Sequence, residues 1–365
     1  MTTPARFRKC RASIDLAAIR ANYRLASRLA PNSQSIAVIK GNAYGHGAVE
    51  VANALQGLAP AFAVGIIDEA LELREAGIRA PILVLQGVAG EDALRAVSEQ
   101  ALSLVVHNEE QLAWLATAKL KAPVSTWLKI DTGMHRLGLP PDRLVDALNR
   151  LRASGASGDS IVVCTHLASA DTPGSMAVRE QLRIFDDCVA GLGVLQSISN
   201  SAGILAWPDT HRSWNRPGYL LYGNSPFAGE QANAALLRPA MTLASEVLAV
   251  RDVATGESVG YHGRWTAAVP SKIATVAIGY ADGYPRHAPD GTPVLVNGAI
   301  APLAGVVSMD LITVDVTALP AVKPGDPVVL WGPDLPANKI AECAGTIGYE
   351  LLIGISRRVP RHYPN

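Results

Sequence analysis

The sequence predicts an α/β protein in which a TIM-like (β/α)8 barrel, residues 1–235, is followed by a mainly β domain, residues 236–365. Three observations support this prediction. A chain of 365 residues is longer than most single domains. Its first part alternates short apolar runs with helical patterns, as parallel βαβ units do. After about residue 236, the apolar runs are separated mainly by Gly, Pro and Asp, which is typical of β structure.

Eight apolar runs are expected to form the barrel strands. Six are distinct and two, the last pair, are weaker: 35–40, 61–67, 81–87, 102–107, 124–131, 160–167, 197–201 and 219–223. The segments between them include DEALELREAG (68–77) and NEEQLAWLATA (108–118), in which Leu and Ala recur every three or four residues. Strands that alternate with such helices predict a closed barrel.

The second domain begins after a polar, Ala-rich connector at 227–239. Its apolar runs include MTLASEVLAV, SKIATVAIGY, LITVDV and DPVVLW, with few helical stretches between them. The sequence contains no internal repeat. We therefore expect one barrel and one β domain.

Charge and cysteine content narrow the class of protein. Lys and Arg together number 32, as do Asp and Glu, so the formal net charge is zero and a nucleic-acid or anionic-membrane partner is not expected. The segment MTTPARFRKCRASIDL has no apolar run that could serve as a signal peptide, so none is expected, and no run of 18 apolar residues occurs. The four cysteines, Cys10, Cys164, Cys188 and Cys343, are scattered without a CxxC pair. We expect reduced thiols and a cytoplasmic location.

The segment AVIKGNAYGHG (37–47) places Lys40 at the end of an apolar strand. Active sites of such barrels form at that end of the strands. Burial lowers the pKa of an amine, which suits Schiff-base formation, and the glycines that follow would let the backbone approach a ligand. The alternative is a strand-end lysine that only reaches solvent.

AVIKGNAYGHG resembles the cofactor-lysine segment of the alanine racemases, barrel proteins with a C-terminal β domain. Eight further segments resemble that family in the same order: KIDTGMHRLG (129–138), THLASAD (165–171), SNSAGIL (199–205), NRPGYLLYGNSP (215–226), VGYHGRW (259–265), IGYADGYPR (278–286), VSMD (307–310) and GTIGYELL (345–352). The resemblance spans essentially the whole chain. It implies an isomerase that interconverts L-alanine and D-alanine with pyridoxal 5'-phosphate.

The resemblance implies roles for Lys40 and Arg216. Lys40 would bind the cofactor covalently and act as one catalytic base. Arg216 would face the pyridine nitrogen of the cofactor. Because a guanidinium only donates hydrogen bonds, that nitrogen would stay unprotonated, which weakens the ring as an electron sink and favours racemisation over transamination. From the RPG motif alone, the alternative for Arg216 is a surface ion pair.

The resemblance also implies the donors that hold the cofactor phosphate. These are the hydroxyls of Tyr44, Ser201 and Tyr349 and the backbone N–H groups of Gly218 and Tyr219, with Asn200 supporting the loop. Neutral donors of this kind suit a dianion. Each tyrosine, taken alone, could instead be a packing residue.

Racemisation needs a second base on the opposite face of the substrate, and Tyr261 matches the family's second base. In the family this tyrosine comes from the partner subunit, so the resemblance implies a homodimer with shared active sites. His166 would lie between Tyr261 and Arg216 and tune the phenol. The alternative for His166 is a core histidine bonded to backbone.

Lys129 lies on the strand face that also carries Trp127 and Asp131. The resemblance implies that Lys129 is carbamylated and that the resulting anion holds Arg136, which would contact the cofactor and the substrate carboxylate. Met309 of the partner would complete the carboxylate site through its backbone N–H, with Asp310 orienting its neighbours. A plain ion pair between Lys129 and Asp131 is the alternative.

Other site classes find little support. No HExxH or paired CxxC is present, so no metal is expected, and GLGVLQ (191–196) lacks the third glycine of a dinucleotide fingerprint. The chain departs from the commoner family wording at Gly41, His262, Val306, Gly348 and Gly354, and Val306 leaves the selectivity of the substrate corridor open.

Alternative activities remain within related classes. They are a racemase acting on serine, on a basic amino acid or on many amino acids, a decarboxylase of related fold, and a cofactor-binding homeostasis protein. The last would lack a β domain, and a decarboxylase would not need Tyr261. A role in supplying D-alanine for peptidoglycan and a catabolic role are both compatible with the sequence.

Overall fold

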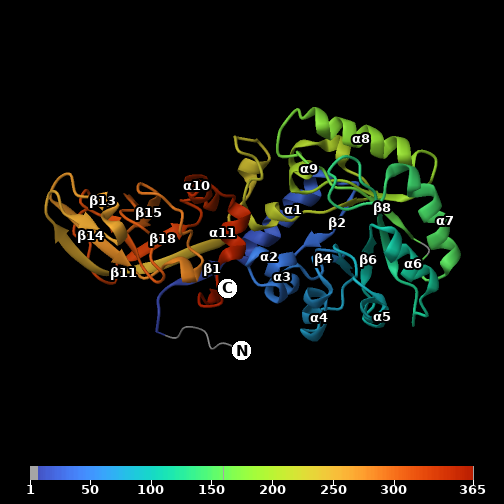
Figure 1. Cartoon of the computed structure of the whole chain (residues 1–365), viewed down its shortest axis with the longest axis horizontal. Coiled ribbons are helices and arrows are strands. Elements are labelled where there is room, and N and C mark those ends of the chain that lie inside the picture. The colour runs from blue at the N-terminus through green and yellow to red at the C-terminus, as the bar shows by residue number, and fades with distance from the viewer. Residues whose placement is uncertain (1–6, 159, 365) are drawn as a thin grey trace.

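The computed structural model describes residues 7–158 and 160–364. They form a barrel of strands and helices and, beside it, a β domain (Figure 1). Helix α11 (Gly348–Gly354) lies where the two parts meet, and the long strand β11 (Met241–Val253) runs from there through the β domain.

The barrel sheet is parallel, and its strands pair in chain order. Only Ile36 separates β2 from β3, so the two count as one strand of the barrel. Because β2 pairs with the last strand, β10, and β3 pairs with β4, the sheet closes into a ring of eight strands. The predicted fold class is therefore confirmed. The strands are β2 (Gln34–Ser35), β3 (Ala37–Val38), β4 (Phe62–Val64), β5 (Ile82–Val84), β6 (Ser103–Val106), β7 (Ser125–Lys129), β8 (Val162–Cys164), β9 (Leu195–Ser197) and β10 (Trp214–Asn215).

Helices connect the strands and cover the outside of the barrel (Figure 1). In α6 the side chain of Asn108 accepts a hydrogen bond from the backbone N–H of Gln111, and two glutamates occupy the first turn, as a helix start requires. The helices are α1 (Leu16–Leu29), α2 (Lys40–Tyr44), α3 (Ala48–Leu55), α4 (Ile67–Glu75), α5 (Glu91–Glu99), α6 (Glu109–Thr117), α7 (Leu144–Ser154), α8 (Met176–Val189) and α9 (Ser201–Ala206), with 3-10 turns η1 (Pro141–Arg143), η2 (Pro208–Thr210) and η4 (Ala234–Leu236).

The eighth strand does not lie where the sequence placed it. The prediction of a strand at 219–223 is wrong, because β10 ends at Asn215 and residues Tyr219–Tyr222 form the 3-10 turn η3. Pro217 has no N–H to offer a strand ladder, and the apolar run that follows it is buried in a turn. A short buried run has no period that separates strand from helix.

The β domain is built around β11, which pairs with β14 and β18 and, at its start, with β1. Strand β1 (Arg11–Ile14) therefore lies in the C-terminal sheet although it precedes the barrel in the chain. The other elements are β12 (Ser258–Val259), β13 (Trp265–Thr266), β14 (Ser271–Val276), β15 (Pro293–Val296), β16 (Ala299–Pro302), β17 (Ile312–Asp315), β18 (Pro327–Trp331), β19 (Arg361–His362), η5 (Tyr261–Gly263), η6 (Tyr280–Asp282) and α10 (Ala337–Cys343). None of the helices in the described ranges is long and apolar enough to cross a membrane.

Candidate active site

The predicted site residues of the barrel follow the carboxyl ends of its strands. Because these ends meet at one mouth in a parallel barrel, the residues are brought together although they are far apart in sequence. They are Lys40 after β3, Lys129 and Arg136 at the end of β7 and in the loop after it, His166 after β8, Asn200 and Ser201 after β9, and Arg216, Gly218 and Tyr219 after β10.

Lys40 opens α2, and its amine forms no hydrogen bond or ion pair with any described residue. The side chain is open to solvent in the single chain. Even so, the walls of the mouth remove enough solvent to lower the pKa of Lys40, and repulsion from Arg136 adds to this, while Glu69 acts in the opposite direction and Arg216 lowers the pKa further. An amine with a lowered pKa is available as a nucleophile or a base.

Glu69, in the first turn of α4, supports the loop that carries Lys40. Its carboxylate accepts hydrogen bonds from the backbone N–H of Gly41 at 2.6 Å and of Gly65 at 2.7 Å. This carboxylate therefore ties the ends of β3 and β4 together directly beside Lys40.

Arg216 is held rigidly at the mouth, with 7% of its surface exposed. Its Nη1 donates to Ser197 Oγ at 2.6 Å, and its Nη2 donates to the carbonyls of Thr165 at 2.6 Å and Ile198 at 3.1 Å. No carboxylate of the described chain lies within ion-pair distance of it. The alternative of a surface ion pair is therefore wrong, and the guanidinium is free to donate to a neutral acceptor.

His166 lies beside Arg216, with 3.4 Å between its Nδ1 and Arg216 Nη2. Burial lowers the pKa of His166 well below its ordinary value, and the positive charges of Arg216 and Lys129 act in the same direction. The imidazole is therefore neutral. Since a guanidinium cannot accept, Nδ1 is the accepting nitrogen in this contact.

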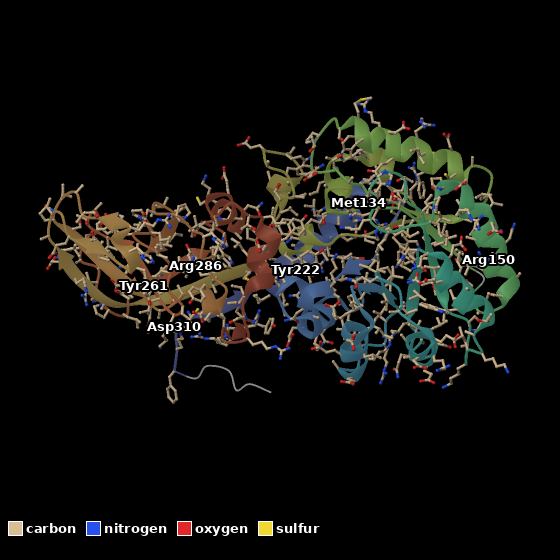
Figure 2. The ribbon with its side chains drawn as sticks, in the orientation of Figure 1. Met134, Arg150, Tyr222, Tyr261, Arg286 and Asp310 are labelled. Atoms are coloured by element: carbon tan, nitrogen blue, oxygen red, sulfur yellow. The ribbon has the colours of Figure 1, made fainter. Side chains whose placement is uncertain are left out.

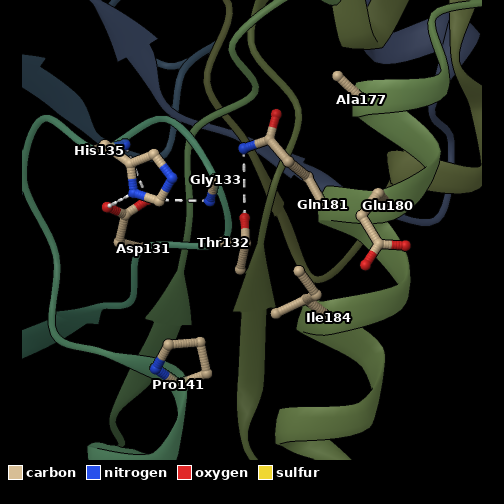
Figure 3. A pocket seen from close by; sticks show the side chains of 9 residues that line it. All are labelled: Asp131, Thr132, Gly133, His135, Pro141, Ala177, Glu180, Gln181 and Ile184. Carbon is tan, nitrogen blue, oxygen red and sulfur yellow. Dashed lines mark hydrogen bonds and ion pairs between the residues drawn. The ribbon is translucent and has the colours of Figure 1, made fainter.

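The loop after β7 is organised by Asp131. Its Oδ1 accepts from the backbone N–H of Gly133, Met134 and His135 at 2.9–3.1 Å, and its Oδ2 lies 3.1 Å from His135 Nδ1 (Figure 3). Asp131 is thus committed to its own loop, and the structure shows no ion pair between it and Lys129. The hollow of about 360 Å³ drawn in Figure 3 lies between this loop and α8, and none of the predicted cofactor residues lines it.

Lys129 points into the barrel. Trp127, on the same face of β7, lies against Trp214 of β10 with ring centroids 5.9 Å apart, and β7 and β10 are not neighbours in the sheet. Burial lowers the pKa of Lys129; Cys164 opposes this, while Arg216 and Arg136 lower the pKa further. A second amine of lowered pKa therefore lies near two guanidinium groups.

Four tyrosines lie close together: Tyr44, Tyr219, Tyr222 and Tyr349. Tyr44 lies 4.8 Å from Tyr222 and 6.1 Å from Tyr349 between ring centroids. The hydroxyls of Tyr44 and Tyr349 have no hydrogen-bond partner in the part of the chain that the structure describes. A Cβ at Gly218 would lie 2.7 Å from the Tyr44 hydroxyl, so only glycine fits there. Close to it, Ser201 Oγ accepts from the N–H of Gly218 at 3.1 Å.

Two predicted residues lie elsewhere. Tyr261, in η5 of the β domain, is 64% exposed, and Met309 is 53% exposed. Figure 2 shows Tyr261 in the β domain, far from Tyr222 and from the barrel loop of Met134. Within one chain, the structure does not bring Tyr261 or Met309 to the barrel mouth.

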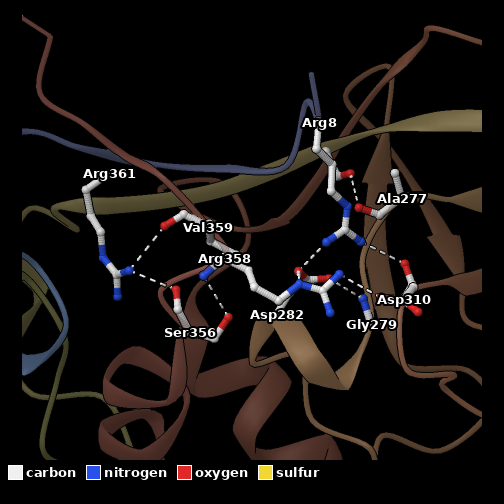
Figure 4. Close-up of polar contacts among 10 residues, drawn as sticks. Arg8, Ala277, Gly279, Asp282, Asp310, Ser356, Arg358, Val359 and Arg361 are labelled. Atoms are coloured by element: carbon white, nitrogen blue, oxygen red, sulfur yellow. Dashed lines mark hydrogen bonds and ion pairs between the residues drawn. The ribbon is translucent and has the colours of Figure 1, made fainter. Parts of the chain in front are cut away.

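A cluster of charges holds the Met309 loop. The buried carboxylate of Asp282 pairs with Arg8 and lies 3.5 Å from Arg358, which also pairs with Asp310 at 2.6 Å (Figure 4). Arg8 donates a further bond to the carbonyl of Asp310 at 2.8 Å. Arg8 and Arg358 therefore both hold Asp310, the residue that follows Met309, although the side chain of Met309 is exposed.

Residues 14–226 match the family model of the alanine racemase N-terminal domain, and residues 240–363 match that of the C-terminal domain. The chain belongs to the alanine racemase family. The family resemblance predicted from the motifs is confirmed.

Individual members of the family agree with this assignment over their full length. An alanine racemase of Chromohalobacter salexigens is 48% identical over 97% of both chains. The crystal structure of a biosynthetic alanine racemase from Pseudomonas aeruginosa is 44% identical, covers 98% of this chain and 100% of its own, and superposes with a TM-score of 0.95. A Bartonella henselae alanine racemase, described with covalently bound pyridoxal phosphate, is 31% identical, covers 99% and 100% of the chains, and has a TM-score of 0.90.

Several residues that shape this racemase-family site were missed in the sequence. Ser197 and Thr165 hold Arg216, and Asp282 holds the Met309 loop, yet none stands out by type or spacing. Glu69 is the exception. An acid in the first turn of a helix that follows a barrel strand is positioned to bind backbone N–H groups at the mouth, and its place in DEALELREAG could have indicated this.

Proposed function

We propose that this chain interconverts L-alanine and D-alanine with pyridoxal 5'-phosphate, in a homodimer whose two active sites are shared between subunits. The observation that supports this most is the barrel mouth. There, Lys40, an amine of lowered pKa with no partner among the described residues, shares one site with Arg216, a fixed guanidinium that has no carboxylate of the described ranges within ion-pair distance. Such a pair suits a cofactor that carries both an aldehyde and a neutral ring nitrogen.

The chemistry of the donors fits that cofactor. Lys40 would hold it covalently and Arg216 would donate to its ring nitrogen. The phosphate would be bound by the hydroxyls of Tyr44, Ser201 and Tyr349 and by the N–H groups near Gly218 and Tyr219, with Asn200 capping α9 beside them through a bond to Gly203 N at 2.9 Å. When bound, pyridoxal phosphate supplies an electron sink that makes the α-proton of an amino acid acidic.

Two side chains would move that proton. Lys40 Nζ would remove or return it on one face of the α-carbon, and Oη of Tyr261 of the partner subunit would do so on the other. The neutral imidazole of His166 would lie between this phenol and Arg216. The exposure of Tyr261 and its distance from its own barrel support a second subunit as the source of this base.

Lys129 would act through a carbamate. A neutral amine can attack the carbon of CO2 and lose a proton, which forms a carbamate anion, and the nearby Arg136 and Arg216 would stabilise that anion. Arg136 so held, with the backbone N–H of the partner subunit's Met309, would bind the substrate carboxylate. Crystallographic density should show the additional atoms on Nζ of Lys129. A bare ammonium there would contradict this step.

We also propose a cytoplasmic location, because four scattered cysteines that form no pair suit a reducing compartment. The activity is tested by incubating the purified protein with D- and L-alanine, serine, lysine and glutamate and by measuring the enantiomer formed. We expect racemisation of alanine to be the fastest and to require added pyridoxal phosphate after dialysis against a scavenging amine. Faster racemisation of serine or lysine would assign the chain to the alternative substrate class.

A further inference from the structure

Asn338, in α10 of the β domain, links that domain to the barrel mouth. Its Oδ1 accepts a hydrogen bond from the hydroxyl of Tyr219 at 2.5 Å, and its Nδ2 donates to the carbonyl of Ser225 at 2.8 Å. Because both ends of the amide are bonded, the side chain has one orientation, with the oxygen toward the tyrosine. Asn338 therefore fixes the end of the Tyr219 ring.

Gly348 provides the space for this hydrogen bond. A Cβ at this position would lie 2.1 Å from the hydroxyl oxygen of Tyr219 and 2.2 Å from Oδ1 of Asn338. Both distances are far below a van der Waals contact. Any side chain at 348 would therefore displace the hydrogen bond between Tyr219 and Asn338.

The ring of Tyr219 in turn holds the ring of Tyr349. The two rings stack with centroids 3.6 Å apart and planes inclined by 10°, and Tyr219 is only 2% exposed. Burial, with a contribution from Asp171, raises the pKa of Tyr349 to about 12, so its phenol is neutral and can donate a hydrogen bond. Tyr349 follows Gly348 directly, and its hydroxyl has no partner in the described chain.

We propose that Asn338 and Gly348 are positioning residues for the cofactor phosphate, because they lock Tyr219 and, through it, the Tyr349 hydroxyl that donates to the phosphate. This inference rests on the proposed function. A donor that is already oriented loses little rotational freedom when the ligand binds, and therefore binds it more tightly. The hydrogen bond between Tyr219 of the barrel and Asn338 of the β domain spans the two domains, so the β domain sets the affinity of the barrel for the cofactor.

The test measures the affinity of the full-length protein for pyridoxal phosphate by equilibrium dialysis. Loss of one hydrogen bond to a charged group should weaken binding about 10-fold in Tyr349→Phe. Asn338→Ala should weaken it about 5-fold, and Tyr219→Phe, which keeps the stacked ring, should have a similar effect. The control Asn233→Ala removes a side-chain hydrogen bond to the Leu205 carbonyl at 2.7 Å, which involves none of these tyrosines, and should leave the affinity unchanged.

The decisive measurement is the combination of variants. If Asn338 acts through the Tyr349 hydroxyl, Asn338→Ala should change the affinity less than about 2-fold in a Tyr349→Phe background. Gly348→Ala should weaken binding about 10-fold alone, and less than that when Asn338 is already alanine.

Each result separates this inference from the proposed function. Wild-type protein that does not bind pyridoxal phosphate would contradict the function itself. If the wild-type protein binds the cofactor, two results would overturn the positioning role alone. One is that Asn338→Ala weakens binding as strongly in the Tyr349→Phe background as it does by itself. The other is that neither Asn338→Ala nor Tyr219→Phe changes the affinity.

Discussion

The barrel mouth and the outer loops of the β domain contain candidate catalytic residues in opposite states. At the mouth, Arg216 is buried and held by three short hydrogen bonds, and Glu69 fixes the loop of Lys40. In the β domain, the side chains of Tyr261 and Met309 are mostly exposed. The barrel mouth therefore holds its groups in fixed positions, whereas the β domain exposes its groups to solvent.

This contrast indicates how the catalytic work is divided. The barrel fixes groups that must hold a cofactor in one geometry, which rigid strand ends do well. The β domain fixes backbone instead, since Asp282, Arg8 and Arg358 brace the Met309 loop while its side chain stays exposed. Exposed but rigid groups are what a shared site requires, because they must meet a second subunit without rearranging.

The largest effect is expected at Lys40. Lys40→Ala removes both the amine that would hold the cofactor and one base, so racemisation should fall by about 10⁴-fold or more. Borohydride reduction of the wild-type protein with pyridoxal phosphate, followed by peptide mapping, should place the pyridoxyl group on Lys40. If it is found on Lys129 instead, the assignment of the two lysines is wrong.

Tyr261→Phe tests the catalytic role of the exposed residues of the β domain. The ring volume is kept but the proton-transferring oxygen is lost, so racemisation should fall about 10³-fold in both directions. The family resemblance implies that Lys40 faces the α-proton of D-alanine. Exchange of that proton with deuterated solvent should therefore persist from D-alanine and nearly stop from L-alanine.

Two outcomes would contradict this assignment. Equal loss of exchange from both enantiomers would indicate a structural role for Tyr261. Unchanged racemisation would mean that another residue is the second base, and Tyr280 is then the next to test, because Tyr284 is buried in the β domain.

Mixing inactive subunits tests whether the two regions meet between chains. Lys40→Ala and Tyr261→Ala subunits, mixed in equal amounts, should form mixed dimers in half of the population. Each mixed dimer would rebuild one of two sites, so about a quarter of the wild-type activity should return. Differently tagged subunits would show that exchange has occurred. Exchange without recovered activity would exclude the shared site.

The sequence predicted the architecture of the barrel better than the bounds of its strands. Six barrel strands were located because apolar runs before helical patterns are distinctive. The weaker run at 197–201 shares only Ser197 with β9, and the eighth strand was displaced from Trp214–Asn215 to a buried turn after Pro217. Strand β1 joins the C-terminal sheet, which no local pattern indicates, because pairing across more than 200 residues leaves no trace in a short segment.

The site residues themselves were named mainly through family resemblance. The residues that hold them in place were not predicted, because a hydrogen bond such as that from Arg216 to the Thr165 carbonyl depends on backbone position and not on residue type. The tight fit at Gly348 is another example. The residue could be read as a departure in the sequence, but its reason, the hydrogen bond between Tyr219 and Asn338, appears only in three dimensions.

The smallest effect concerns the pH dependence of stability at the barrel mouth. His46 is fully buried below Tyr222, with ring centroids 4.5 Å apart, and its Nδ1 donates to the carbonyl of Tyr44 at 2.9 Å. Burial lowers the pKa of His46 to about 4, from 6.5 in the ordinary state, although its backbone hydrogen bonds act in the opposite direction. Above pH 6.5 the residue is neutral in both the folded and unfolded chain and contributes no pH dependence.

As the pH falls from 6.5 to 4, the unfolded chain takes up a proton that the folded chain refuses, so up to about 3 kcal/mol of unfolding free energy should be lost. His46→Gln keeps a donor for the carbonyl but cannot titrate. Denaturant unfolding at several pH values should show wild type losing its advantage over the variant across this window, with no further divergence below pH 4. Parallel curves for the two proteins from pH 7 to pH 4 would show that His46 is not the group that links the barrel mouth to pH.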